Sequence, residues 1–232
     1  MYNEASVIKQ TALALSDYMM KTFACEGYEI IFSDDGSTDG SAAIVEELAL
    51  PCVRIVSYPD KKNRGKGAAV RNAVLSSNGD IVMFTDADLA YGTDVIKKVA
   101  DAFDSSPDAS MIIGSRNLTG DGYSGYTITR KLASKAYIKV LGFVGGFKLS
   151  DSQCGCKAYR QGAARDIFSK CKVDGFAFDF ETILRAQKYG YRIAEIPVKI
   201  VNHRESKVRV LRDTFKMLTD LSKIKKDIKK EK

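Results

Sequence analysis

The stretch DIVMFTDAD, residues 80–88, combines a short apolar run with two aspartates one residue apart. The run predicts a buried strand, and Asp86 and Asp88 come at its carboxyl end. Because side chains alternate along an extended chain, the two carboxylates point the same way. Mg²⁺ and Mn²⁺ are typically held by one or two such carboxylates, while substrate phosphates and water fill the other positions. The stretch therefore predicts a divalent-metal site with Asp86 and Asp88 as ligands.

A general acid–base pair of the glycosidase type is the alternative interpretation of these two aspartates. Such a pair needs carboxyl groups roughly 5–9 Å apart. Two residues of one strand end are better placed to chelate a cation, which would neutralise a diphosphate leaving group. We therefore favour a metal that carries a nucleotide diphosphate.

Apolar runs alternate with helical periodicity along the whole chain. Strands are predicted at 28–35, 53–58, 80–88, 110–116, 153–160 and 193–201, and helices at 6–22, 40–50, 66–78, 94–104, 162–170 and 179–189. Continuous apolar strands are typical of a mostly parallel sheet that has helices on both faces. We expect one α/β domain, with its last strand at a sheet edge or at the start of a hairpin because it contains Pro197.

Polar clusters follow three of these strands. They lie at 34–37, 86–88 and 114–116. Ligands of open α/β sheets bind outside the carboxyl ends of the strands, so we expect the clusters to converge on one site. Helix caps are the alternative for single aspartates, and Asp39 and Asp94 are interpreted as N-caps. The loop 117–129 is the longest predicted, which suggests a mobile segment over the site.

Charge and composition exclude several classes of protein. The 232 residues carry 36 Lys and Arg against 29 Asp and Glu, and the excess is concentrated in residues 208–232. No aromatic and basic residues interleave at the sheet, so nucleic acid is not an expected partner. The longest central apolar run, 140–147, is too short to span a bilayer, and no signal peptide leads the chain.

The five scattered cysteines predict reduced core thiols in the cytoplasm. Cys154 and Cys156 flank a glycine, but there is no second cysteine pair and His203 is the only histidine. The pattern argues against a zinc site.

Seven motifs, in order, resemble those of family-2 glycosyltransferases. They are Tyr2-Asn3-Glu4, DDGSTDGS (34–41), NRGKGAAVRNA (63–73), TDADLA (85–90), GSRN (114–117), DSQCGCK (151–157) and FAFDFETILRAQKYGYRIAEIPVKI (176–200). The resemblance extends over residues 1–215 and is strongest to the dolichyl- or polyprenyl-phosphate branch, glucosyl type. It implies the GT-A fold, a Rossmann-like nucleotide-binding α/β domain.

The resemblance also implies roles for individual residues. Those expected to hold the uridine end of the donor are Tyr2, Glu4 and Asp35, with Lys66 and Asp86 beside it. Asp88 is expected to be the principal metal ligand. The residues matched to an acceptor-phosphate site are Arg116, Arg130 and Ser134. Arg130 and Ser134 are four apart on a predicted helix, with Arg130 in its first turn, where phosphate is favoured.

Other carboxylates have open roles. Asp151 is the best candidate for a base or an orienting group, and capping a turn is an equal alternative. Asp179 opens a helix and is interpreted as its N-cap, while the role of Glu181 stays open.

Four departures from the family pattern stand out. The chain starts at Tyr2-Asn3-Glu4, where the family first has an apolar strand, so we expect that strand to be missing. Ala90 replaces a metal-binding glutamine of mannosyl synthases, which argues against a mannosyl enzyme. The family usually has other residues at the positions of Cys156-Lys157 and Glu205, and both differences concern details of the acceptor site.

These features together favour inverting transfer of a hexose, with glucose preferred, from a UDP-sugar to polyprenyl or dolichyl phosphate. A phosphate monoester has a second pKa near 6, so it can attack without a strong base. One alternative is transfer to a sugar hydroxyl of a polysaccharide or glycan, which would need a true base. Another is a non-catalytic nucleotide-sugar-binding protein.

A lipid acceptor would bring the protein to the cytoplasmic face of a membrane as a peripheral protein. The tail at 216–232 is predicted to form a basic amphipathic helix. Residues 208–232 carry nine Lys and Arg against four Asp and Glu. Such a helix can lie in the headgroup plane. The alternatives are a helix packed on the sheet, which we favour for 208–218, and a partner membrane protein.

Overall fold

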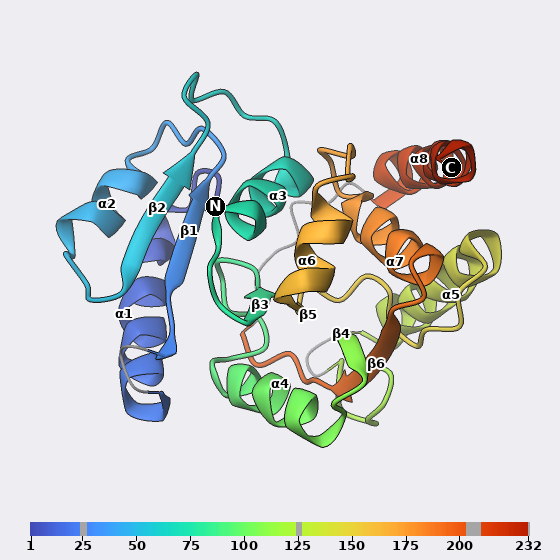
Figure 1. The fold of residues 1–232 in the computed structure, drawn as a ribbon, viewed down its shortest axis with the longest axis horizontal. Coiled ribbons are helices and arrows are strands. Elements are labelled where there is room, and N and C mark those ends of the chain that lie inside the picture. Colours follow the sequence, from blue (N-terminus) through green and yellow to red (C-terminus); the bar gives the residue numbers. More distant parts are fainter. Residues whose placement is uncertain (24–26, 124–126, 203–209, 232) are drawn as a thin grey trace.

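The computed structural model describes residues 1–23, 27–123, 127–202 and 210–231, with the side chains of 128–133, 136–137 and 210–218 left out. Helices and strands alternate along the chain (Figure 1). The strands are β1 (Ile30–Asp34), β2 (Val53–Ser57), β3 (Ile81–Phe84), β4 (Ala109–Ser115), β5 (Lys157–Arg160) and β6 (Arg192–Pro197). The helices are α1 (Ala5–Thr22), α2 (Ser41–Glu47), α3 (Lys66–Ser76), α4 (Asp94–Ser105), α5 (Ile128–Gly145), α6 (Gln161–Phe168), α7 (Phe178–Lys188) and α8 (Val210–Lys230).

The strands form two sheets. β1 and β2 pair in parallel, and the larger sheet has the order β3-β5-β4-β6. β5 runs antiparallel to both of its neighbours, whereas β4 and β6 are parallel. The expected parallel pairing is therefore found in two of the ladders, and the sheet directions are mixed. β6, which contains Pro197, lies at a sheet edge as expected.

Met1 pairs with the edge of β1. Its amino group donates to the carbonyl of Ser33 at 2.5 Å, and its carbonyl accepts from the amide of Asp35. No described strand hydrogen-bonds to both β1 and β3. The two sheets are therefore separate in the part of the chain that the structure describes.

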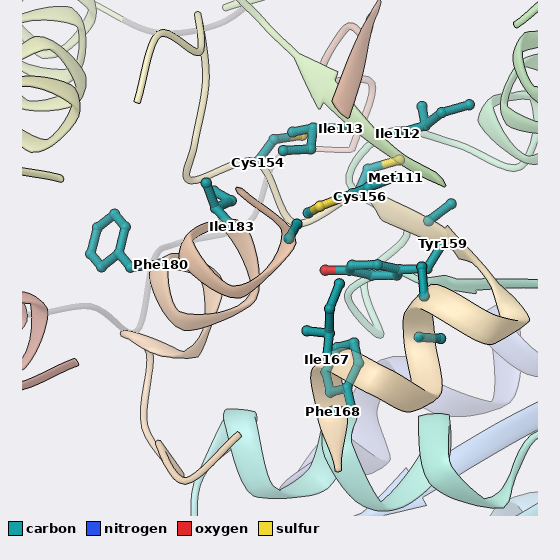
Figure 2. Packing of buried hydrophobic residues seen from close by; sticks show 14 of the residues in the cluster. Met111, Ile112, Ile113, Cys154, Cys156, Tyr159, Ile167, Phe168, Phe180 and Ile183 are labelled. Atoms are coloured by element: carbon teal, nitrogen blue, oxygen red, sulfur yellow. The ribbon is translucent and has the colours of Figure 1, made fainter. Parts of the chain in front are cut away.

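Two hydrophobic clusters match the two sheets. The smaller one joins α1 and α2 to β1 through Ile8, Val45 and Phe32. The larger one surrounds β4, and Figure 2 shows part of it. Its centre includes Met111 and Ile112, which are almost fully buried because helices cover both faces of the sheet: α4 lies on one side, and α6 and α7 on the other (Figure 1).

Helix α8 packs on the domain. The helix continues without a break across residues 215 and 216, where the tail was expected to begin. Leu221 and Ile224 are buried in the larger hydrophobic cluster. Lys225 donates to the carbonyl of Val144, near the end of α5. The described apolar face of the tail therefore points inward, and Lys223, Lys226, Lys229 and Lys230 are exposed.

Three smaller expectations have clear outcomes. Asp39 accepts the amides of Ala5 and Ser41, but the N-caps of α1 and α2 are Glu4 and Gly40, so the interpretation of Asp39 as an N-cap is wrong. Asp94 is the first residue of α4 and not its N-cap, which is Thr93. Cys154, Cys156 and Cys171 are buried free thiols, but the expectation of reduced cysteines is wrong for Cys52, which is disulfide-bonded.

Candidate active site

Asp86 and Asp88, which we call the acidic pair, follow the carboxyl end of β3. Asp86 forms an ion pair with the ammonium group of Lys66, with 2.5 Å between Nζ and Oδ1. Partial burial lowers the pKa of Lys66, but the negative charge of Asp86, followed by that of Asp179, outweighs this and raises it. A lysine at the first position of α3 thus partly balances the charge at the strand end.

The donor set around Asp86 and Asp88 fits a hard divalent cation. Both are carboxylates, and the side chain of Asp86 is 38% exposed. One oxygen of Asp88 accepts the amide of Ala90, which fixes the carboxylate against its own turn. The described residues contain no cluster of three or more His, Cys, Asp or Glu side chains that could hold a metal. A cation bound here would take further oxygens from substrate and water, which suits Mg²⁺ or Mn²⁺.

Gly155 approaches Asp86 from the loop 151–156. A Cβ atom at this position would stand 2.2 Å from Oδ2 of Asp86. This explains why a strand predicted over 153–160 begins only at Lys157: the chain first bends around the carboxylate. The glycine of the Cys154-Gly155-Cys156 sequence therefore allows close packing on Asp86.

Asp35 organises the loop that leads into α3. Its carboxylate is almost fully buried and accepts the side-chain amide of Asn63 and the backbone amides of Arg64 and Gly65. These contacts place Lys66 beside Asp86. A direct contact of Asp35 with the nucleotide stays a prediction.

The other predicted donor residues lie at the same edge. Tyr2 is 43% exposed, and the amide of Glu4 bonds the hydroxyl of Ser41. Through Met1, this N-terminal segment pairs with β1, whose carboxyl end leads into Asp35. The structure thus brings the segments of Tyr2, Glu4 and Asp35 together.

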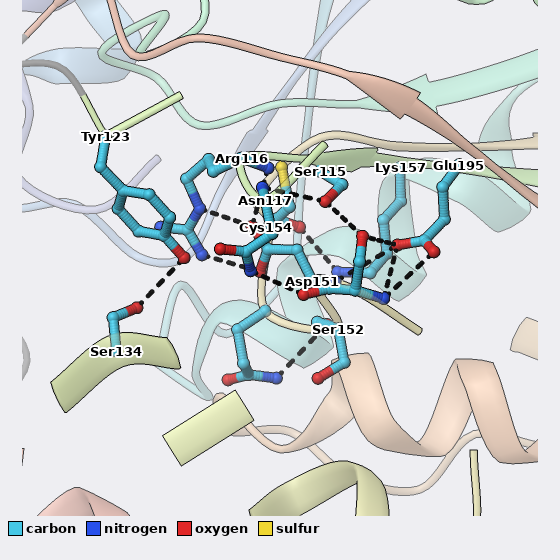
Figure 3. Close-up of polar contacts among 12 residues, drawn as sticks. Ser115, Arg116, Asn117, Tyr123, Ser134, Asp151, Ser152, Cys154, Lys157 and Glu195 are labelled. Atoms are coloured by element: carbon cyan, nitrogen blue, oxygen red, sulfur yellow. Dashed lines mark hydrogen bonds and ion pairs between the residues drawn. The ribbon is translucent and has the colours of Figure 1, made fainter. Parts of the chain in front are cut away.

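A second cluster forms at the end of β4. Arg116 donates from Nε and Nη2 to the two oxygens of Asp151, at 2.6 and 2.9 Å (Figure 3). Its backbone amide also donates to Asp151. The side chain of Asp151 is fully buried, whereas that of Arg116 is 12% exposed. Asp151 therefore orients the arginine, and its oxygens are occupied by that contact.

Glu195 is a site residue that the sequence prediction missed. From β6, it accepts the backbone amides of Ser150 and Asp151 and the hydroxyl of Ser150 (Figure 3). A carboxylate in the apolar run 193–201 was the available signal, since a charged residue in a strand needs a partner. Glu195 fixes the backbone from which Asp151 holds Arg116.

Ser134 reaches the same cluster through Tyr123. Its hydroxyl lies 3.4 Å from that of Tyr123, and the guanidinium of Arg116 lies 5.2 Å from the Tyr123 ring centre. The sequence patterns did not predict Tyr123 as a site residue. Arg130 belongs to α5, but its side chain lies outside the described residues, as do residues 124–126 of the predicted loop 117–129.

A buried ion pair lies beneath the acidic pair. Lys157 donates to Asp179 at 2.5 Å and to the carbonyl of Cys154, and its side chain is fully buried. Burial raises the pKa of Asp179 despite the opposing effect of Lys157. The interpretation of Asp179 as an N-cap is wrong, because α7 begins at Phe178 and Asp179 faces the interior.

Glu181 has a structural role. It accepts the amides of Lys172 and Val173 and forms an ion pair with buried Arg185. The carbonyl of Asp174, which follows Val173 in the chain, accepts the amide of Ala68 in α3. Glu181 therefore supports the loop that packs on the start of α3.

The comparisons with known proteins agree with this arrangement. Residues 1–168 match the glycosyl transferase family 2 profile, so the chain belongs to that family. A dolichyl-phosphate beta-glucosyltransferase of Trichomonas vaginalis is 32% identical over 203 residues, covering 85% of this chain and 59% of the relative. Its counterpart from Homo sapiens is 30% identical over 219 residues, covering 89% and 67%. Glycosyltransferase AglD of Haloferax volcanii is 28% identical over 93% of this chain, which spans 34% of that protein.

Solved structures confirm the GT-A fold. Glucosyl-3-phosphoglycerate synthase from Mycobacterium tuberculosis, in complex with Mn²⁺, UDP-glucose and glycerol 3-phosphate, has a TM-score of 0.69 at 16% identity, covering 98% of this chain and 77% of that one. Mannosyl-3-phosphoglycerate synthase from Rubrobacter xylanophilus has a TM-score of 0.70 at 16% identity, covering 100% and 74%. At these identities the likeness establishes the fold alone.

Proposed function

We propose that this protein transfers a hexose, with glucose the preferred sugar, from a UDP-sugar to a polyprenyl or dolichyl phosphate, with inversion at the anomeric carbon. One observation carries the proposal. The loop 151–156 packs on Asp86 through Gly155 and orients Arg116 through Asp151, so the proposed metal and acceptor-phosphate sites would share one wall.

The donor would bind over the acidic side of that wall. Tyr2, Glu4 and Asp35 would lie at its uridine end, and Asp86 and Asp88 would hold the Mg²⁺ or Mn²⁺ ion that offsets charge on the leaving diphosphate. Lys66 would add a second cation near the same phosphates. The glucosyl-3-phosphoglycerate synthase structure with Mn²⁺ and UDP-glucose supports this choice, since it has the same fold.

The acceptor phosphate would bind at Arg116, with Ser134 and Arg130 as further partners. A phosphate dianion attacks the anomeric carbon as the bond from that carbon to the UDP oxygen breaks, and no proton has to be removed. This chemistry suits a site where both oxygens of Asp151 already accept hydrogen bonds from Arg116. The dolichyl-phosphate beta-glucosyltransferases among the relatives support the same acceptor class.

A polyprenyl acceptor places the reaction at a membrane. Among the described residues, no helix is both long and apolar enough to cross one. We propose peripheral association at the cytoplasmic face, directly or through a membrane-protein partner. The names of the relatives, which act on dolichyl phosphate, support a membrane setting.

The test is an assay with a panel of UDP- and GDP-hexoses, a short polyprenyl phosphate, and either Mg²⁺, Mn²⁺ or EDTA. We expect a lipid-linked product from UDP-glucose with either metal and none with EDTA. A product formed only with a glycan acceptor would show that the acceptor is a hydroxyl group. Binding of UDP without turnover on any acceptor would show a non-catalytic protein.

A further inference from the structure

Helix α5 exposes an apolar face to solvent. Phe143 is 90% exposed and Val140 is 49% exposed. The two are three positions apart, so they lie on one side of the helix. Exposed apolar side chains at this spacing are costly in water and indicate a contact surface.

The charged residues of the chain segment that contains this face all have one sign. Residues 122–150 contain five basic residues (Arg130, Lys131, Lys135, Lys139 and Lys148) and no acidic one, although 29 of the 232 residues of the chain are acidic. Lys135 and Lys139 are both exposed. Apolar side chains on a helix whose own charged residues are all basic match an anionic lipid surface.

A groove connects this face to the Arg116 cluster. It has a volume of about 480 Å³ and is lined by residues that include Phe143, Phe147, Asn117 and Ser150. Asn117 follows Arg116 and donates to the carbonyl of Ser150 at 2.6 Å. The outer rim of the groove is therefore the exposed part of α5, and its inner end borders the proposed phosphate site.

The apolar residues of α8 are not available for the same role. Leu221 and Ile224 are buried against the domain. Lys225 donates to the carbonyl of Val144, so this basic residue of α8 lies at the end of α5, and Figure 1 shows the two helices next to each other. The tail can add charge to the surface of α5, but the described part of it offers no free apolar face.

We propose that Lys135, Lys139, Val140 and Phe143, which we call the α5 face, dock on an anionic lipid bilayer. Phe143 and Val140 enter the interface, and the lysines contact anionic headgroups. This docking would bring a lipid-linked acceptor to the mouth of the groove. It goes beyond the proposed transfer and is measured without donor or acceptor, so either idea can fail while the other stands.

The test is flotation of the full chain with phosphatidylcholine vesicles that contain or lack phosphatidylglycerol. We expect binding to the anionic vesicles at low salt. The double variant Val140→Ser/Phe143→Ser should bind about tenfold more weakly, because the apolar insertion is lost. Met20→Ser on α1 is the matched control: Met20 is 49% exposed, like Val140, and its variant should bind as the wild type does.

A second double variant, Lys135→Gln/Lys139→Gln, tests the charges. We expect a loss of about tenfold at low salt that shrinks as salt is added. Thermal unfolding should be unchanged in both double variants, since the substituted side chains are exposed. Undiminished binding of Val140→Ser/Phe143→Ser would overturn the proposal, as would equal wild-type binding to neutral vesicles. A vesicle-free dimer that this variant abolishes would show instead that a second copy covers the α5 face.

Discussion

Gly155 and Asp86 are packed so closely that no side chain fits between them. A Cβ atom on Gly155 would lie 2.2 Å from Asp86 Oδ2 and 3.1 Å from its Cγ. The same loop holds Arg116 through Asp151. One short segment of chain therefore contacts both Asp86 and Arg116.

Gly155→Ala should reduce turnover while leaving the fold intact. The clashing atom is the end of a side chain, so Asp86 can rotate away at little cost in stability. The displaced carboxylate would then misplace the metal and the donor, and a shift of this size can cost about 10²-fold in rate. The measurement is kcat together with the unfolding midpoint.

Gly162→Ala is the control for this substitution. Gly162 lies in α6, and a Cβ atom there has no neighbour within 4 Å. It should retain wild-type kinetics. Equal activity of the Gly155 and Gly162 variants would show that the contact with Asp86 is unimportant for catalysis.

Asp88→Ala should remove metal-dependent turnover. A carboxylate ligand at this position contributes to the charge stabilisation of the leaving diphosphate, so we expect a loss of about 10²-fold or more. Binding of Mn²⁺, followed by electron paramagnetic resonance with UDP present, should weaken in parallel. Asp104→Ala, on the α4 surface, controls for the loss of one negative charge. Full wild-type activity in EDTA would contradict the metal role.

The sequence predicts the elements well where apolar runs are continuous, and less well where tertiary contacts decide. The run before Asp86 forms β3 as expected, but the first part of 153–160 is a loop because Gly155 packs on Asp86. The order β3-β5-β4-β6, with β5 antiparallel, was not predictable from local patterns, since strand direction depends on the path of the connections.

The candidate site was likewise predictable where local patterns decide and not where tertiary contacts do. Strand-end polar clusters predicted that the segments of Asp35, Asp86 and Arg116 would share one sheet edge. The partners that orient them come from distant segments: Glu195 supports the Asp151 loop, and buried Lys157 pairs with Asp179. A buried lysine looks like a surface residue in sequence, because only the folded chain supplies its partner.

Acidification should loosen the end of α8. Glu231 accepts hydrogen bonds from Arg185, and this contact lowers the pKa of Glu231 below its usual value of 4.5. A depressed carboxyl pKa adds stability above the unfolded value, and that stability is lost as the pH falls through the folded value. Glu231→Gln should lower the melting temperature by about 2 °C at pH 7 and by less below pH 4. An equal shift at both pH values would contradict the ion-pair explanation.

Arg116→Lys and Asp151→Asn should impair the acceptor step by the same route. Lysine lacks the fork that spans the two oxygens of Asp151, and asparagine offers only one oxygen to that fork. Each variant should raise the acceptor KM or lower kcat about 10-fold or more, with the Kd for UDP nearly unchanged. The double variant should lose little beyond either single one, because both break one contact. If Asp151→Asn instead abolishes turnover while Arg116→Lys does not, Asp151 acts as a base and the acceptor is a hydroxyl group. If UDP affinity falls in both variants, these residues serve the donor.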